Sequence, residues 1–378
     1  INTDDEDQLD IAPGDYCVSP VDILNTNSGE KVIAGQIFKF TEELRPYINT
    51  KITRITNVSQ AVEMTKTREY SNILKIILIS LLAKDQQFVF SNLFHHINDE
   101  NLRQAFRAID GSKAVGIDNM TKKQYGENLD ENLRLLKDKL HLGTYRPQVK
   151  REVLIPKANG QTRPIAIGCF EDKIVEWVLG KILESVYEPV FIRNSFGFRP
   201  RKSAHDAIKA NYEILKHDER PHVVEIDLKS FFNTVPHDMM EEIISYRIQD
   251  RKLMGVIRRF LKAAILKQDG TQEKSTVGTP QGSIMSPILA NIYLHHVLDR
   301  WFMTNYASKD AVIVRYADDA VFMFKHEDKA KSFLQELEQR LNKYGLLLNQ
   351  EKTGMINFKK GQEKVFHFLG FTFYWNHR

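Results

Sequence analysis

The sequence predicts a mixed α+β fold, and three observations lead to that prediction. Ala311–Phe324 reads as a β-hairpin, because two runs rich in β-branched and aromatic residues flank the short polar segment Arg315–Asp319. His222–Leu228 is a further strand-like run. Apolar residues recur at helical spacing in segments on both sides of these strands, such as Asn98–Ile109 and Lys329–Tyr344.

The chain has 378 residues, enough for a large core and for two or three subdomains. Its net charge of +4 is unevenly distributed. Residues 1–50 hold three Lys or Arg and ten Asp or Glu, whereas residues 51–378 carry a net charge of +11. The larger part is therefore basic enough to attract a polyanion, although many proteins of this charge bind no nucleic acid.

Cysteine usage and hydropathy limit the class of protein. Cys17 and Cys169 are far apart and lack metal-ligand spacing, which argues against a disulfide framework or a zinc site and indicates a reducing compartment. The longest apolar stretch, Ile73–Ala83, is too short to cross a bilayer and predicts a buried helix. We therefore expect no membrane partner and a cytoplasmic location.

The turn of the predicted hairpin carries two adjacent carboxylates, Asp318 and Asp319. Between buried strands they would repel each other, at a cost on the order of several kcal/mol, unless a cation neutralises them. An exposed turn would explain an isolated pair equally well. However, Asp227 ends the strand His222–Leu228 and can add a third carboxylate. Three carboxylates suffice to hold two Mg²⁺ ions about 3.5–4 Å apart for in-line phosphoryl transfer.

The N-terminal half begins with an extension, residues 1–85, to which the sequence assigns no role. A long polar helix is expected at Tyr125–His141. Arg151–Pro156 and Arg163–Ile167 then predict a hairpin around the turn at Asn159–Gly160, with Lys157 near its tip. Cations on such a hairpin suit triphosphate binding, and ordinary surface charge explains them equally well.

A basic turn follows and runs into a helix that Ser203 is expected to cap. Its cations Arg199, Arg201 and Lys202 at a helix N-terminus predict a phosphate site or simply a charged loop.

Val277–Phe302 predicts a Gly/Pro-rich turn leading into one long apolar helix. Gly282 allows a ligand to approach the backbone, and Gln281 offers both a donor and an acceptor. Near the C-terminus, Phe366–Trp375 reads as an aromatic strand pair around Gly370, for which core packing alone is a sufficient explanation.

Taken in order, these segments resemble the motifs of reverse transcriptases, with Asp227 in motif A, the Pro280–Gly282 turn in motif B and Asp318–Asp319 in motif C. The flanking sequence resembles the group II intron-encoded kind, over about residues 90–378. The resemblance implies the fingers and palm of a right-hand polymerase, the palm being an antiparallel sheet backed by helices, with the thumb absent from this chain. It also implies three parts: an extension at 1–85, mainly fingers at 86–220, and mainly palm at 221–378.

The resemblance assigns roles residue by residue. The catalytic and metal-binding groups would be Asp227, Asp318, Asp319 and the carbonyl of Leu228. The nucleotide-binding residues would be Lys157, Arg163, Phe232, Gln281, Gly282 and Lys352. Template or primer would contact Arg199, Arg201, Leu369, Gly370 and Phe371. The ring of Phe232 would exclude the 2′-hydroxyl of ribonucleotides, while Phe231 packs in the core.

The implied activity is RNA-directed DNA synthesis with two Mg²⁺ ions, which Mn²⁺ is able to replace. The implied partners are an RNA template, a DNA primer, dNTPs and structured intron RNA, in a bacterial cytoplasm near the nucleoid or RNA. A maturase that stabilises intron RNA is an alternative, as is a reverse transcriptase recruited to CRISPR adaptation or phage defence. Phe232 argues against an RNA-dependent RNA polymerase. The sequence leaves the oligomeric state open.

Overall fold

The computed structural model describes residues 79–80, 82–156, 160, 162–217, 219–307 and 310–375. The chain divides into two compact units. One comprises Ile1–Ile11, Val89–Leu183 and Phe191–Arg378, and the other Ala12–Phe88 and Glu184–Val190. The described residues of the first unit contain every candidate site residue except Lys157.

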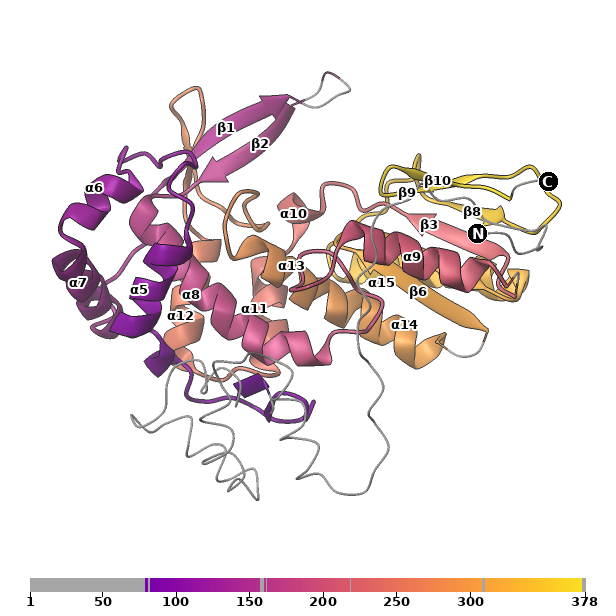
Figure 1. Cartoon of the computed structure of the whole chain (residues 1–378), viewed down its shortest axis with the longest axis horizontal. Coiled ribbons are helices and arrows are strands. Elements are labelled where there is room, and N and C mark those ends of the chain that lie inside the picture. The colour runs from indigo at the N-terminus through magenta and orange to yellow at the C-terminus, as the bar shows by residue number, and fades with distance from the viewer. Residues whose placement is uncertain are drawn as a thin grey trace, which may run out of the picture. The chain divides into compact units, whose positions relative to one another are not determined.

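In the described residues, helices alternate with short strands (Figure 1). The helical segments are η3 (Phe94–His96), α5 (Asp99–Ala108), α6 (Lys122–Glu127), α7 (Leu129–His141), α8 (Phe170–Tyr187), η4 (Glu188–Val190), α9 (Ala204–Leu215), α10 (Phe231–Thr234), α11 (His237–Ser245), α12 (Arg251–Leu261), α13 (Ser286–Leu294), the π-helix η5 (His295–Asp299), α14 (Arg300–Asn305) and α15 (Glu327–Lys343). The strands are β1 (Lys150–Pro156), β2 (Thr162–Ile167), β3 (His222–Ile226), β4 (Ile265–Leu266), β5 (Gln272–Glu273), β6 (Ala311–Tyr316), β7 (Asp319–Phe324), β8 (Gly354–Asn357), β9 (Phe366–Phe368) and β10 (Phe371–Phe373).

The central sheet has the strand order β6-β7-β3-β8, and each neighbouring pair is antiparallel. β6 and β7 form the predicted hairpin, and β3 is the predicted strand that precedes Asp227. The sheet confirms the predicted fold class.

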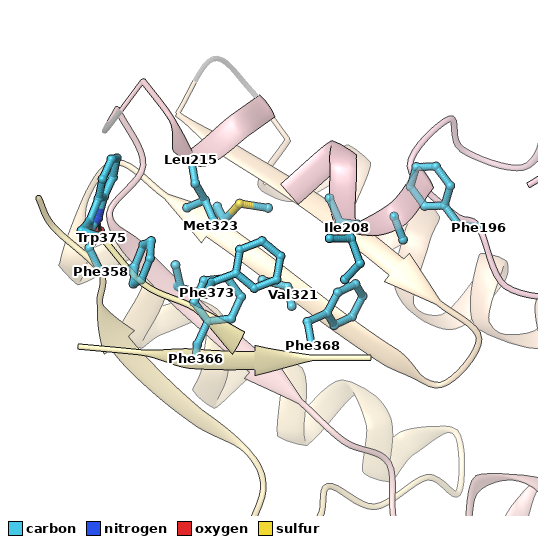
Figure 2. Close-up of a cluster of buried hydrophobic side chains, with 13 residues drawn as sticks. Phe196, Ile208, Leu215, Val321, Met323, Phe358, Phe366, Phe368, Phe373 and Trp375 are labelled. Carbon is cyan, nitrogen blue, oxygen red and sulfur yellow. Dashed lines mark hydrogen bonds between the residues drawn. The ribbon is translucent and has the colours of Figure 1, made fainter. Parts of the chain in front are cut away.

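Apolar side chains of β7 point alternately to the two faces of the sheet, and both faces are covered. Phe322 and Phe324 pack against Phe333 of α15, with ring centroids 4.5 and 5.2 Å apart. Val321 and Met323, which point the opposite way, belong to a second cluster with Ile208, Leu215, Phe358 and the aromatic residues of β9 and β10 (Figure 2). The sheet therefore lies between α15 on one side and the α9 and β9–β10 layer on the other.

A second sheet has the order β2-β1-β4-β5. β1 and β2 pair antiparallel, as predicted, whereas β1 and β4 pair in parallel. The sequence analysis predicted neither β4 nor β5. Two strand residues give too little pattern to detect from the sequence.

Two predicted helices are wrong in detail. The helix expected at Tyr125–His141 is divided into α6 and α7 at Asn128, whose ψ of 43° departs from helical geometry. The apolar helix expected within Val277–Phe302 contains the π-helix η5 between α13 and α14. Among the described residues, no helix is long and apolar enough to span a bilayer.

Candidate active site

The register of the central sheet brings Asp227 and Asp319 side by side. Ile226 of β3 pairs with Ala320 of β7, so the next residue of β3, Asp227, lies opposite Asp319. Both side chains share the sheet face of Val321, which the β9–β10 hairpin covers. Asp318 occupies the adjoining turn, so three carboxylates from two strands gather at one end of the sheet.

The carboxylates interact electrostatically. Burial and the neighbouring Asp227 raise the pKa of Asp318. Burial raises the pKa of Asp319 to about 6, with further contributions from Asp318 and Asp227. A bound cation would remove this mutual repulsion.

Asp227 is held by the segment after α15. Its Oδ2 accepts a hydrogen bond from Asn349 Nδ2 at 2.7 Å and lies 3.6 Å from Lys352 Nζ. The Asp227 carbonyl accepts from Asn349 N, and Lys229 N donates to Leu347 O, both at 2.8 Å. These hydrogen bonds pair the backbone on both sides of Leu228 with the segment around Leu348.

The donor set suits a hard divalent cation, because it consists of carboxylate and carbonyl oxygens. Within the part of the chain that the structure describes, no three acidic, histidine or cysteine side chains already form a complete metal cage. Asp227 instead directs one oxygen to Asn349.

Two predicted cations lie near the aspartates. Arg163 of β2 is close enough to lower the pKa of Asp318, against the larger effect of burial. Lys352 similarly opposes the rise in the pKa of Asp319. Lys157, the third predicted cation, lies outside the described residues.

The Pro280–Gly282 turn is hydrogen-bonded to the β1–β2 hairpin and packs closely against it. Ala166 N donates to the carbonyl of Gln281 at 2.7 Å. Gly282 has a φ of +100°, and a Cβ there would lie 2.6 Å from Ile165 Cγ2, so only glycine fits. Gln281 Oε1 is buried without a hydrogen-bond partner among the described residues.

The same loop also contacts the helix after Asp227. Thr279 N donates to Phe232 O at 2.7 Å, and a Cβ on Gly278 would lie 2.8 Å from that oxygen. Beside this contact opens a cavity of about 270 Å³ whose lining includes Phe232 and Gln281 but none of the three aspartates. Phe231 is fully buried and Phe232 only partly, which matches the packing role predicted for Phe231.

The cations predicted to contact template differ in their surroundings. Arg199 Nη1 donates to the carbonyls of Ile192 and Ser195 at 2.7 Å each, so it stabilises its own loop. Arg201 is exposed and has a φ of +57°. Ser203 caps α9 as predicted, in a capping box with Asp206.

The predicted primer-contacting residues form the turn between β9 and β10. Leu369 and Gly370 both have positive φ, at 54° and 81°, which defines a two-residue hairpin turn. Stacked rings of Phe366 and Phe373, 4.6 Å apart, anchor the hairpin in the cluster of Figure 2. The turn is therefore rigidly supported on the aspartate face of the sheet.

The structure adds residues that the sequence analysis missed. Asn349 holds Asp227, and its only sequence signal is a position three residues before Lys352. Arg315 is fully buried beneath the turn of Asp318. A charged residue within an apolar strand is the signal that could have identified it.

Comparisons with known proteins agree with this arrangement. Residues 155–373 match the family model described as reverse transcriptase (RNA-dependent DNA polymerase). The chain is 32% identical to protein YkfC of Escherichia coli over 296 residues, 69% of this chain and 76% of that protein. It is 38% identical to the group II intron-encoded protein LtrA of Lactococcus lactis over 196 residues, 51% of this chain and 31% of that protein.

A third relative is an uncharacterized 91 kDa protein in a cob intron of Schizosaccharomyces pombe, 42% identical over 147 residues. That match covers 39% of this chain and 18% of the yeast protein. The chain thus spans most of YkfC but less than a third of the two intron proteins.

Proposed function

Because this chain belongs to the reverse transcriptase family, and within it to the group II intron type, we propose that it is an RNA-directed DNA polymerase. The reaction would add dNTPs to the 3′-hydroxyl of a primer on an RNA template. The supporting observation is the convergence of Asp227, Asp318 and Asp319 at the ends of two neighbouring strands.

The metal-binding residues would be these three aspartates together with the carbonyl of Leu228. Two Mg²⁺ ions, or Mn²⁺ in their place, would supply Lewis acidity that lowers the pKa of the primer hydroxyl and stabilises the leaving pyrophosphate. The raised pKa of Asp318 and Asp319 supports this assignment, since their mutual repulsion favours cation binding.

The other residues would orient the nucleotide. Arg163 and Lys352 lie near the carboxylates and would bind the triphosphate, together with Lys157. Gln281 would offer its unpaired amide oxygen to the nucleotide, and the ring of Phe232 would occupy the space that a 2′-hydroxyl needs. The Leu369–Phe371 turn would hold the primer, and Arg201 would contact the template.

The RNA partner we propose is structured group II intron RNA, with polymerisation serving intron mobility in the cytoplasm. The names of LtrA and of the fission-yeast protein, both of which refer to introns, support this context. A role limited to stabilising intron RNA would not require three convergent carboxylates, and these therefore favour the polymerase.

The test is primer extension on an RNA template by the intact chain and by an Asp318→Ala, Asp319→Ala variant. We expect extension to fall below about one thousandth of the wild-type rate. In EDTA the Tm of the variant should be no lower than that of the wild type. The pKa values of Asp318 and Asp319 are raised in the folded state, so their ionised forms destabilise it at pH 7 and their removal should not lower its stability.

A matched control removes two carboxylates elsewhere, at the exposed α7 positions Glu131 and Asp138, by substitution with Ala. This control should retain wild-type extension. Comparable extension by the Asp318→Ala, Asp319→Ala variant would rule out the assignment of these residues.

A further inference from the structure

A buried ion pair lies beneath the turn of Asp318. Arg315 of β6 donates from Nε and Nη2 to the two carboxylate oxygens of Asp299, at 2.7 and 2.6 Å. Both side chains are fully buried. Burial alone would raise the pKa of Asp299, but the Arg315 guanidinium lowers it overall, so the pair stays charged. Such a two-pronged contact fixes the orientation of both groups.

The remaining arm of the guanidinium contacts the turn itself. Arg315 Nη1 donates to the carbonyl of Ala317 at 2.8 Å and to Asn291 Oδ1 at 3.1 Å. Ala317 directly precedes Asp318 and has a φ of +55°. A residue with a Cβ adopts this conformation only where its surroundings hold it there. The hydrogen bond from Arg315 is one such restraint.

The loop before α9 supplies a second restraint. Arg315 N donates to Asn194 O at 2.9 Å. A Cβ on Gly197 would lie 2.3 Å from Ala317 N, so the backbones of the loop and the turn are in direct contact. Asn291 Nδ2 donates to Gly197 O at 2.8 Å and thereby ties this loop to the same cluster.

Asp299 reaches Arg315 from the end of the π-helix η5. A π-helix shifts the residues after it around the helix axis and often marks a functional position. Arg340 of α15 supports this irregular segment by donating to the carbonyls of Val297 and His296 at 3.0 and 3.4 Å. The widened turn is therefore stabilised from outside by Arg340 and from inside by Arg315.

We propose that Arg315, oriented by Asp299 and Asn291, is a positioning residue that fixes the backbone of the 317–318 turn and so the placement of the catalytic carboxylates. The proposal rests on the polymerase function proposed above. Arg315 acts from the sheet face opposite Asp319, since Ile313 and Arg315 share one face of β6 while Val314 lies in the α9 cluster. It supports the turn without contacting substrate.

Arg315→Lys provides the first test. Lysine keeps the positive charge beside Asp299, but its single ammonium group cannot hydrogen-bond to Asp299, Asn291 and the Ala317 carbonyl in the planar geometry of a guanidinium. We expect kcat of primer extension to fall about 10²-fold, the scale of a 1 Å misplacement, while KM for dNTP changes little. The Mg²⁺ concentration for half-maximal activity should rise, because the three aspartates would no longer be held in the arrangement that binds the ions.

A second variant tests the same role without leaving an uncompensated charge in the core, which could prevent folding. Arg315→Met combined with Asp299→Leu removes both charges together, which proteins tolerate better than one uncompensated buried charge. We expect this protein to fold and to show the same loss of kcat. Hydrogen–deuterium exchange of peptides from 311–324 should be faster than in the wild type, and this readout needs no catalytic activity.

The control is Leu341→Ala, which shortens a buried side chain in the last turn of α15. It should lower Tm while leaving kcat and the Mg²⁺ dependence unchanged at temperatures where it is folded. Wild-type kcat, Mg²⁺ dependence and exchange in both Arg315 variants would overturn the positioning role. Absence of extension by the wild-type protein itself would instead contradict the proposed function, and exchange would still report on the turn.

Discussion

At the scale of single residues, Phe231 and Phe232 show how adjacent identical side chains come to lie in different surroundings. Phe231 is 2% exposed and packs in the core, whereas Phe232 is partly buried beside a cavity. The Phe232 ring lies edge-on to Phe231 and Phe198, at centroid distances of 5.3 and 6.3 Å. These neighbours hold Phe232 in place, as a rigid steric barrier requires.

Replacement of Phe232 by Ala should relax discrimination between dNTPs and NTPs by about 10- to 100-fold, since the variant opens space for the 2′-hydroxyl. The measurement is the ratio of kcat/KM for dNTP and NTP incorporation. Phe260→Leu, at a buried position of α12, is the control, which should lower Tm and leave that ratio unchanged. An unaltered ratio in Phe232→Ala would remove the proposed barrier role.

The sequence predicted the three aspartates because each adjoins an apolar run, and a strand formed by that run places them at one end of the sheet. Arg315 and Asn349 escaped prediction for a physical reason. Their roles depend on partners far away in the chain, Asp299 and Asp227 respectively, and no local pattern encodes such a contact.

At the scale of elements, the strands β3, β6 and β7 were predictable because both faces of the sheet are covered, which requires continuous apolar runs. The division between α6 and α7 and the π-helix η5 were not. Each replaces helical geometry over very few residues, and tertiary contacts such as that of Arg340 with η5 stabilise it.

The π-helix should also confer a pH dependence on stability. Burial lowers the pKa of His296 to about 4, and the charges of Arg300 and Arg340 add to this effect. The unfolded chain therefore binds more protons than the folded one between pH 6.5 and about 4. Ionisation of His296 therefore does not reduce the free energy of unfolding above pH 6.5, and it reduces this free energy progressively as the pH falls towards 4.

His296→Phe should flatten this dependence, because phenylalanine keeps the ring stacked 5.3 Å from Tyr246 but does not titrate. The measurement is Tm from pH 7 down to 4 for the wild type and the variant. His217→Phe, at an exposed position, should keep the wild-type slope. An unchanged slope in His296→Phe would show that another group dominates.

At the scale of the whole molecule, charge separation is the property most relevant to nucleic-acid binding. Residues 1–50 carry a net charge of −7, and the remainder carries +11. The basic part contains every candidate contact for template, primer and triphosphate. Its attraction for a polyanion is long-range and nonspecific, whereas specificity must come from the site.

Affinity for an RNA–DNA hybrid should therefore fall linearly on a plot of log K against log salt concentration, with about one unit of slope for each phosphate neutralised. Fluorescence anisotropy at increasing KCl measures the slope. Sucrose at matched osmolality is the control and should leave affinity unchanged. A salt-independent affinity would show that phosphate contacts contribute little to binding.

The contact of Gly197 with the 317–318 turn constrains how this domain can evolve or be recombined. Gly197, Asn291 and Arg315 lie in three separate segments of the chain, yet a change at any one alters the fit of the other two. Chimeras that exchange segments between relatives should keep all three from a single parent, and a crossover between residues 197 and 315 would separate them.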